Sequence, residues 1–157
     1  MKQVLERVRV NARGILQGRQ AARAPGSLAI LAFLKEPNDC NLLQAAATTN
    51  RWQVTLARSE PELCTFLART QAPVALCDRD LLGPNWGAAV QRIAACSPRT
   101  CILLVTKVAD FYLWDEVVRR GGYDLVSKPL QPSELVRALK LAWAYSSSGT
   151  RLASFMK

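Results

Sequence analysis

The chain has 157 residues, half of them hydrophobic and 21% charged, which suits one globular domain and excludes a disordered or fibrous protein. It has a formal net charge of +9 and no histidine, which excludes serine–histidine and cysteine–histidine nucleophiles, a phosphohistidine and the commonest nitrogen ligand of metals. The apolar runs are strand-length and shorter than the roughly 18 residues of a membrane span, so no span is expected.

The cysteines indicate a reducing environment. Their number is odd and no two form a C-x-x-C pair, which argues against both a zinc site and a disulfide framework. We therefore expect reduced thiols and a cytoplasmic protein. The five residues are Cys40, Cys64, Cys77, Cys96 and Cys101.

Residues 1–27 are predicted to form a basic N-terminal arm, helical or disordered. They hold six basic residues against Glu6 alone, which is a net +5 of the total +9. A basic arm can meet nucleic acid, an anionic membrane or an acidic partner. Nucleic-acid binding is a minor hypothesis here, because no aromatic residues are interleaved with the charges and no binding motif is present.

Short apolar runs from residue 28 onward predict five strands. The predicted strands cover residues 28–34, 52–56, 74–77, 101–106 and 123–126. The first run is apolar throughout, which is typical of a strand buried on both faces of a sheet.

Each predicted strand is followed by an amphipathic segment with a helix-start signal. Pro37-Asn38-Asp39 can cap the first helix, and Ser59-Glu60-Pro61-Glu62 forms a capping box for the second. Gly83-Pro84-Asn85 turns into the third helix, Asp110 caps the fourth, and the fifth covers residues 132–145.

Five strand–helix repeats over residues 28–145 predict an α/β domain with an open, doubly wound parallel sheet. Residues 146–157 are expected to form a flexible tail. In sheets of this kind, functional groups collect at the carboxyl ends of the strands. Three polar residues stand there: Asp78, Thr106 and Lys128. A carboxylate can accept a phosphoryl group, while an ammonium and a hydroxyl can stabilise its oxygens.

On these residues the sequence resembles the receiver domain of bacterial response regulators. Three segments carry the resemblance: residues 74–78 with Gly83 five residues later, residues 103–106 and residues 121–129. The resemblance implies a flavodoxin-like (βα)5 sheet with strand order 2-1-3-4-5. It also implies that Asp78 is the phosphoacceptor and that Thr106 and Lys128 are switch residues that sense the phosphate.

The resemblance further implies a non-enzymatic role in two-component phosphorelay signalling, with a sensor kinase or another signalling protein as partner. The runner-up interpretation is a small flavodoxin-like enzyme or nucleotide-binding domain. Neither a G-x-G-x-x-G nor a Walker-type motif supports that alternative.

The acidic pair that helps to hold Mg²⁺ in this family is missing. Alignment on Glu36-Pro37 places Leu34 and Lys35 in those two positions. Unit charges 4 Å apart interact by roughly 4 kcal/mol at an effective dielectric of 20, so Lys35 would penalise a divalent cation. Glu36 and Asp80 are nearby carboxylates that do not replace the pair. We expect weak or absent Mg²⁺ binding and no other cofactor.

Two further departures alter the pocket. Lys107 follows Thr106 where the family has a small residue, and Leu125 occupies the aromatic switch position. Two interpretations stay open: a phosphorylatable receiver with unusual metal ligation, and a pseudo-receiver that acts as an interaction module, in which Lys35 pairs with Asp78. The sequence favours the second.

A partner surface is expected on the face formed by the helix after Asp110, the strand at 123–126 and the helix at 132–145. Phe111, Tyr112 and Trp114 lie too close together in sequence to all point inward. Together with Leu125 they would suit a protein partner or a homodimer contact. The resemblance points to the same face.

Overall fold

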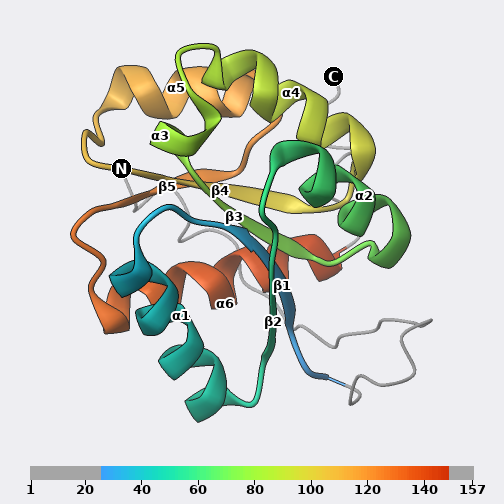
Figure 1. The fold of residues 1–157 in the computed structure, drawn as a ribbon, viewed down its shortest axis with the longest axis vertical. Coiled ribbons are helices and arrows are strands. Elements are labelled where there is room, and N and C mark those ends of the chain that lie inside the picture. The colour runs from blue at the N-terminus through green and yellow to red at the C-terminus, as the bar shows by residue number, and fades with distance from the viewer. Residues whose placement is uncertain (1–25, 149–157) are drawn as a thin grey trace.

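A five-stranded parallel sheet forms the centre of the molecule (Figure 1). The computed structural model describes residues 26–148, so most of the predicted basic arm (1–27) and of the predicted tail (146–157) lies outside the described residues. The strand order is β2-β1-β3-β4-β5, which confirms the predicted doubly wound, flavodoxin-like arrangement. The strands are β1 (Ala29–Phe33), β2 (Gln53–Leu56), β3 (Val74–Asp78), β4 (Cys101–Thr106) and β5 (Asp124–Ser127).

Helices cover both faces of the sheet, with α1 and α6 on one side and α2, α4 and α5 on the other (Figure 1). The helices are α1 (Pro37–Asn50), α2 (Glu60–Thr70), α3 (Arg79–Leu82), α4 (Trp86–Cys96), α5 (Phe111–Arg119) and α6 (Pro132–Ser148). None of the helices within residues 26–148 has the length and apolarity needed to cross a membrane.

Strand alternation divides the core into two layers. In β1, Ile30 and Ala32 pack into the cluster under α1 and α6, whereas Leu31 and Phe33 pack into the cluster under α2, α4 and α5. Successive side chains of a strand point to opposite faces, so a strand covered on both sides must be apolar at every position. This is why the central strands β1, β3 and β4 are almost entirely apolar, whereas the edge strand β2 is mostly exposed and includes Gln53 and Thr55.

The predicted capping residues begin two of the helices. Ser59 Oγ accepts a hydrogen bond of 3.1 Å from the Glu62 amide at α2, and Asp110 Oδ1 accepts one of 2.9 Å from the Leu113 amide at α5. The first helix differs from the prediction. It begins at Pro37 behind Glu36, so Asp39 lies inside the first turn and is not a cap.

Two segments extend the predicted secondary structure. The four-residue helix α3 follows β3 directly, because the Asp78 side chain caps it by accepting from the Asp80 amide. The last helix runs on to Ser148, so the predicted tail begins as helix. Hydrogen bonds from Ser146 Oγ to the Arg99 carbonyl and from Ser148 Oγ to the Tyr145 carbonyl support this end of α6.

The register of the sheet places the three predicted site residues at one edge. Asp78 at the end of β3 lies opposite Val105, and Thr106 at the end of β4 lies opposite Ser127. Lys128 is the next residue after β5, and its amide donates to the Thr106 carbonyl at 2.9 Å. The carboxyl ends of β3, β4 and β5 therefore meet, as expected for a parallel sheet.

Candidate functional site

Asp78 is a buried carboxylate whose two oxygens both have partners. Its Oδ1 accepts a hydrogen bond of 2.8 Å from the Asp80 amide, and its Oδ2 lies 2.8 Å from Lys128 Nζ. Only 1% of the Asp78 side chain is exposed. The predicted meeting of this carboxylate with the Lys128 ammonium is confirmed.

Lys128 lies between two carboxylates. Its Nζ is 2.8 Å from Asp78 Oδ2 and 3.3 Å from Asp39 Oδ2, and 8% of its side chain is exposed. An ammonium without paired charges would be costly to bury at this depth, so the second carboxylate offsets part of its desolvation. The three side chains together carry a net charge of −1.

The environment keeps Lys128 protonated. Burial by itself lowers its pKa, but contact with the Asp78 carboxylate and then with Asp39 outweighs burial, so the pKa is raised above the ordinary 10.5. Because the pKa of Lys128 is higher in the folded state, its ion pairs stabilise the fold in full at pH values below the unfolded-state pKa. This contribution is lost as the pH rises through the folded-state pKa. The ion pairs are therefore intact across the neutral range.

Asp39 is the site residue that the sequence analysis missed. The sequence predicts that it helps to cap the first helix, whereas the structure buries it in the first turn of α1 against Lys128. A signal for this position exists in the sequence. Asp39, Leu43 and Ala46 follow helical spacing and form the buried face of α1, so the period of the helix places this carboxylate toward the sheet.

The predicted ion pair between Lys35 and Asp78 is wrong. Asp78 pairs with Lys128, while Lys35 is exposed and belongs to none of the ion pairs found within residues 26–148. The reason is the direction of the chain between β1 and α1. Leu34 packs partly against the core, whereas Lys35 lies beyond the end of β1, in the bend before α1, where its side chain is exposed.

Thr106 lies at the same edge of the sheet with its hydroxyl in use. Its Oγ1 donates to the Val108 carbonyl at 3.1 Å and accepts from the Val108 amide at 3.2 Å. The threonine is 3% exposed. In this arrangement the hydroxyl holds the turn after β4.

An open cleft of about 590 Å³ lies beside the ion pairs. Asp78 is not among its lining residues, whereas Lys128, whose Nζ contacts the Asp78 carboxylate, is. Lys107 also lines the cleft, with its Nζ 4.0 Å from Asp80 Oδ2 in a pair exposed to solvent. The full lining is Glu36, Pro37, Asn38, Asp39, Lys107, Lys128 and Pro129.

The residues at this edge do not fit Mg²⁺. The metal requires several oxygen ligands in octahedral geometry, and the space between the carboxylates of Asp39 and Asp78 holds the Lys128 ammonium. No group of three or more acidic or cysteine side chains suited to a metal ion is present in the described part of the chain.

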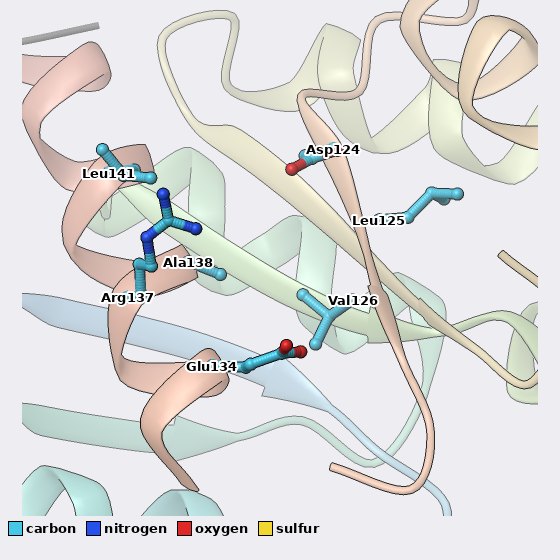
Figure 2. Close-up of a pocket in the computed structure, with 7 residues that line it drawn as sticks. All are labelled: Asp124, Leu125, Val126, Glu134, Arg137, Ala138 and Leu141. Atoms are coloured by element: carbon cyan, nitrogen blue, oxygen red, sulfur yellow. The ribbon is translucent and has the colours of Figure 1, made fainter. Parts of the chain in front are cut away.

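The predicted partner surface is partly exposed. At the start of α5, Phe111 is 62% and Tyr112 83% exposed, and Phe111 lies 5.8 Å from the half-buried Trp114 ring. The inclusion of Leu125 was wrong, because this side chain is only 5% exposed and packs in the cluster under α5. Figure 2 shows Leu125 pointing away from α6 and its neighbour Val126 pointing toward it.

A small hollow between β5 and α6 lies on the same face (Figure 2). Glu134 and Arg137 of α6 border it with opposite charges, and the carboxylate of Asp124 at the start of β5 is buried beside it. At this hollow the exposed charges of Glu134 and Arg137 on α6 lie next to the buried residues of β5.

The structure resembles solved structures of response regulators and their receiver domains. The signal receiver domain of an HD domain-containing protein from Pseudomonas fluorescens Pf-5 is 22% identical with a TM-score of 0.70, over 85% of this chain and 98% of that chain. A response regulator from Thermotoga maritima is 20% identical with a TM-score of 0.67, over 74% and 98% of the two chains.

The chemotaxis protein CheY4 of Vibrio cholerae is 16% identical with a TM-score of 0.64, over 73% of this chain and 97% of that chain. No protein-family profile matches the sequence, and no curated protein matches it. At these identities the comparisons show the fold. The chain has the CheY-like, flavodoxin-like fold that its sequence predicts.

Asp39→Asn tests the ion pair between Asp39 and Lys128. The change keeps the shape of the side chain and removes its charge, so Lys128 retains Asp78 alone in a buried setting. We expect the free energy of unfolding at pH 7 to fall by about 1–3 kcal/mol in urea denaturation. The matched control is Glu36→Gln, which removes a carboxylate from the cleft wall and should change stability by less than about 0.5 kcal/mol. Equal effects of both substitutions would contradict the special position of Asp39.

Proposed function

We propose that this chain is a receiver-like signalling module that acts through protein–protein contacts and not as an enzyme. The fold of response regulator receiver domains and the position of Asp78 at the end of β3 support a place in phosphorelay signalling. A sensor kinase or another signalling protein is the partner proposed, in a reducing, cytoplasmic setting. The departures at the site support a pseudo-receiver.

The observation that carries the proposal is the shielding of Asp78. To accept a phosphoryl group, one carboxylate oxygen must reach the phosphorus atom in line with the leaving group. Here the Asp80 amide contacts one oxygen and the Lys128 ammonium the other, and the side chain is 1% exposed. Each carboxylate oxygen keeps a further lone pair, so access limits the reaction. The groups that cover Asp78 would have to move before a phosphodonor could reach it.

The charge at the site supports the same conclusion. A phosphoryl group carries about 1.5–2 negative charges at neutral pH and would replace the single charge of the Asp78 carboxylate, so phosphorylation would add up to about one negative charge. Lys128 is the ammonium in ionic contact with Asp39 and Asp78. Lys107 pairs instead with Asp80, at 4.0 Å and near solvent. An added phosphate would therefore lack the neutralisation that a divalent cation gives in phosphoryl transfer.

Incubation with acetyl phosphate and Mg²⁺ is the direct test. We expect intact-mass measurements to show no stoichiometric gain of a phosphoryl group, because both oxygens of Asp78 are engaged. Asp78→Asn serves as the control and should give the same spectrum. A stoichiometric gain in the wild-type chain that disappears in Asp78→Asn would refute the pseudo-receiver and establish an ordinary phosphoacceptor.

Adding the missing carboxylates should create a metal site. We expect the double variant Leu34→Asp, Lys35→Asp to bind Mg²⁺ more tightly than the wild type, because two oxygen ligands and the loss of one positive charge both favour the cation. Titration followed by tryptophan fluorescence measures this through Trp86, whose ring lies beside Arg79 at 5.5 Å in the segment after Asp78. The single variant Lys35→Ala separates the loss of repulsion from the gain of ligands. Equal binding by the double variant and the wild type, with the fold intact, would contradict the assignment of these two positions.

The face of α5, β5 and α6 is the proposed contact surface. Exposed aromatic side chains favour protein contacts because they bury a large area at low entropic cost. Phe111 and Tyr112 meet edge to face at 6.2 Å, and Val108 beside them is 55% exposed. A second copy of this chain is one partner that this surface would suit.

Sedimentation velocity over a range of concentrations tests self-association through this face. We expect a concentration-dependent dimer in the wild type that is lost in Phe111→Ser, Tyr112→Ser, because most of the exposed apolar area is removed. Val118→Ser on the same helix is the control, since this side chain is 41% exposed and lies outside the aromatic cluster. A monomer at all concentrations would remove self-association from the proposal and leave another protein as the occupant.

A further inference from the structure

The helices α2 and α4, which lie away from the Asp78 site, are linked by an ion pair between their side chains. α2 and α4 lie next to each other on one face of the sheet (Figure 1). The guanidinium of Arg92 on α4 donates to both carboxylate oxygens of Glu60 on α2, at 2.7 and 2.9 Å. A bidentate contact of this kind fixes the relative register of the two helices.

This register brings two cysteines together. Cys64 lies four residues after Glu60, and Cys96 lies four residues after Arg92. Both helices lead back from the carboxyl end of a parallel strand, so they run in the same direction. One turn further along each helix, the next facing pair is Cys64 and Cys96. The two thiols lie close enough for Cys96 to contribute to the raised pKa of Cys64.

The pair differs from the other cysteines in its access to solvent. Cys64 and Cys96 are both half-buried, whereas Cys77 and Cys101 are fully buried in the strands. Cys40 is also half-buried, but it lies on α1, which packs on the opposite face of the sheet. Neither Cys64 nor Cys96 is part of a disulfide in the described part of the chain.

We propose that Cys64 and Cys96 form a redox modification site, at which a peroxide oxidises the two thiols to a disulfide that joins α2 to α4. In the first step one thiolate attacks the peroxide, the O–O bond breaks, and a sulfenic acid and one water form. In the second step the other sulfur attacks the sulfenic sulfur and displaces its oxygen as a second water. The peroxide gains two electrons, and the thiols lose two electrons and two protons.

The surroundings of the pair set the speed of this reaction. Burial, then contact with Cys96 and the charge of Glu60, raises the pKa of Cys64 to about 12, while Arg92 acts in the opposite direction. The thiolate is the reactive form, so its small fraction at neutral pH makes oxidation slow. The rate should rise about tenfold per pH unit until the thiol titrates. The site is therefore expected to respond to sustained peroxide and to resist brief exposure.

The disulfide would constrain the part of the chain that carries Asp78. The segment between the two cysteines contains β3, α3 and the turn before α4. Cross-linking a long loop removes conformational freedom from the unfolded chain and stabilises the fold. We expect a rise of roughly 5–15 °C in the melting temperature after oxidation, reversed by a thiol reductant.

Oxidation of the full chain with hydrogen peroxide at pH 8, followed by intact mass and peptide mapping without reductant, tests the proposal. We expect the mass to fall by two hydrogens and a cross-linked peptide pair to contain Cys64 and Cys96. Cys64→Ser and Cys96→Ser should each abolish this product, while Cys40→Ser should form it at the wild-type rate. Disulfides that use another cysteine, links between chains, or a gain of oxygen without a Cys64–Cys96 peptide would each overturn the proposal. Phosphorylation at Asp78 does not enter these measurements, so their outcome is independent of the proposed signalling role.

Discussion

The buried ammonium of Lys128 between the carboxylates of Asp39 and Asp78 is the interaction on which this site depends. It joins the end of β3, the first turn of α1 and the chain after β5, three segments that are distant in the sequence. Each charge would be costly to bury by itself, and each becomes tolerable because the others lie within ion-pair distance. The Lys128 ammonium thereby holds the carboxylates of Asp39 and Asp78 together at this edge of the sheet.

These ion pairs, and not the fold, determine the chemistry of the site. A fold is compatible with many activities, and function depends on the geometry of particular side chains. Here the carboxylate at the end of β3 faces an ammonium and a backbone amide, and Thr106 holds its own turn. This arrangement underlies the proposed role as an interaction module. The exposed rings at the start of α5 belong to the proposed contact surface.

The fold was predictable because its causes are local and repeated. Strands buried on both faces need apolar residues, and the central strands β1, β3 and β4 meet this requirement at nearly every position. Capping residues such as Ser59 and Asp110 act within one helical turn, so they can be recognised from neighbouring letters alone. The four-residue helix α3 was missed because it depends on one side chain, Asp78, that caps it while also serving the site.

The sequence by itself determined the alternation of strands and helices and the meeting of Asp78 with Lys128, because the register of parallel strands brings the residues at their carboxyl ends together. The order of the strands was what the resemblance to receiver domains implied. Only the tertiary structure decided which further charge joins them. Lys35 and Asp39 are four residues apart, yet the turn between β1 and α1 directs the lysine to solvent and the carboxylate inward. The first turn of α1 is buried against the sheet, so Asp39 points inward. A charged side chain on a buried helix face is stable only next to an opposite charge, which Lys128 supplies here.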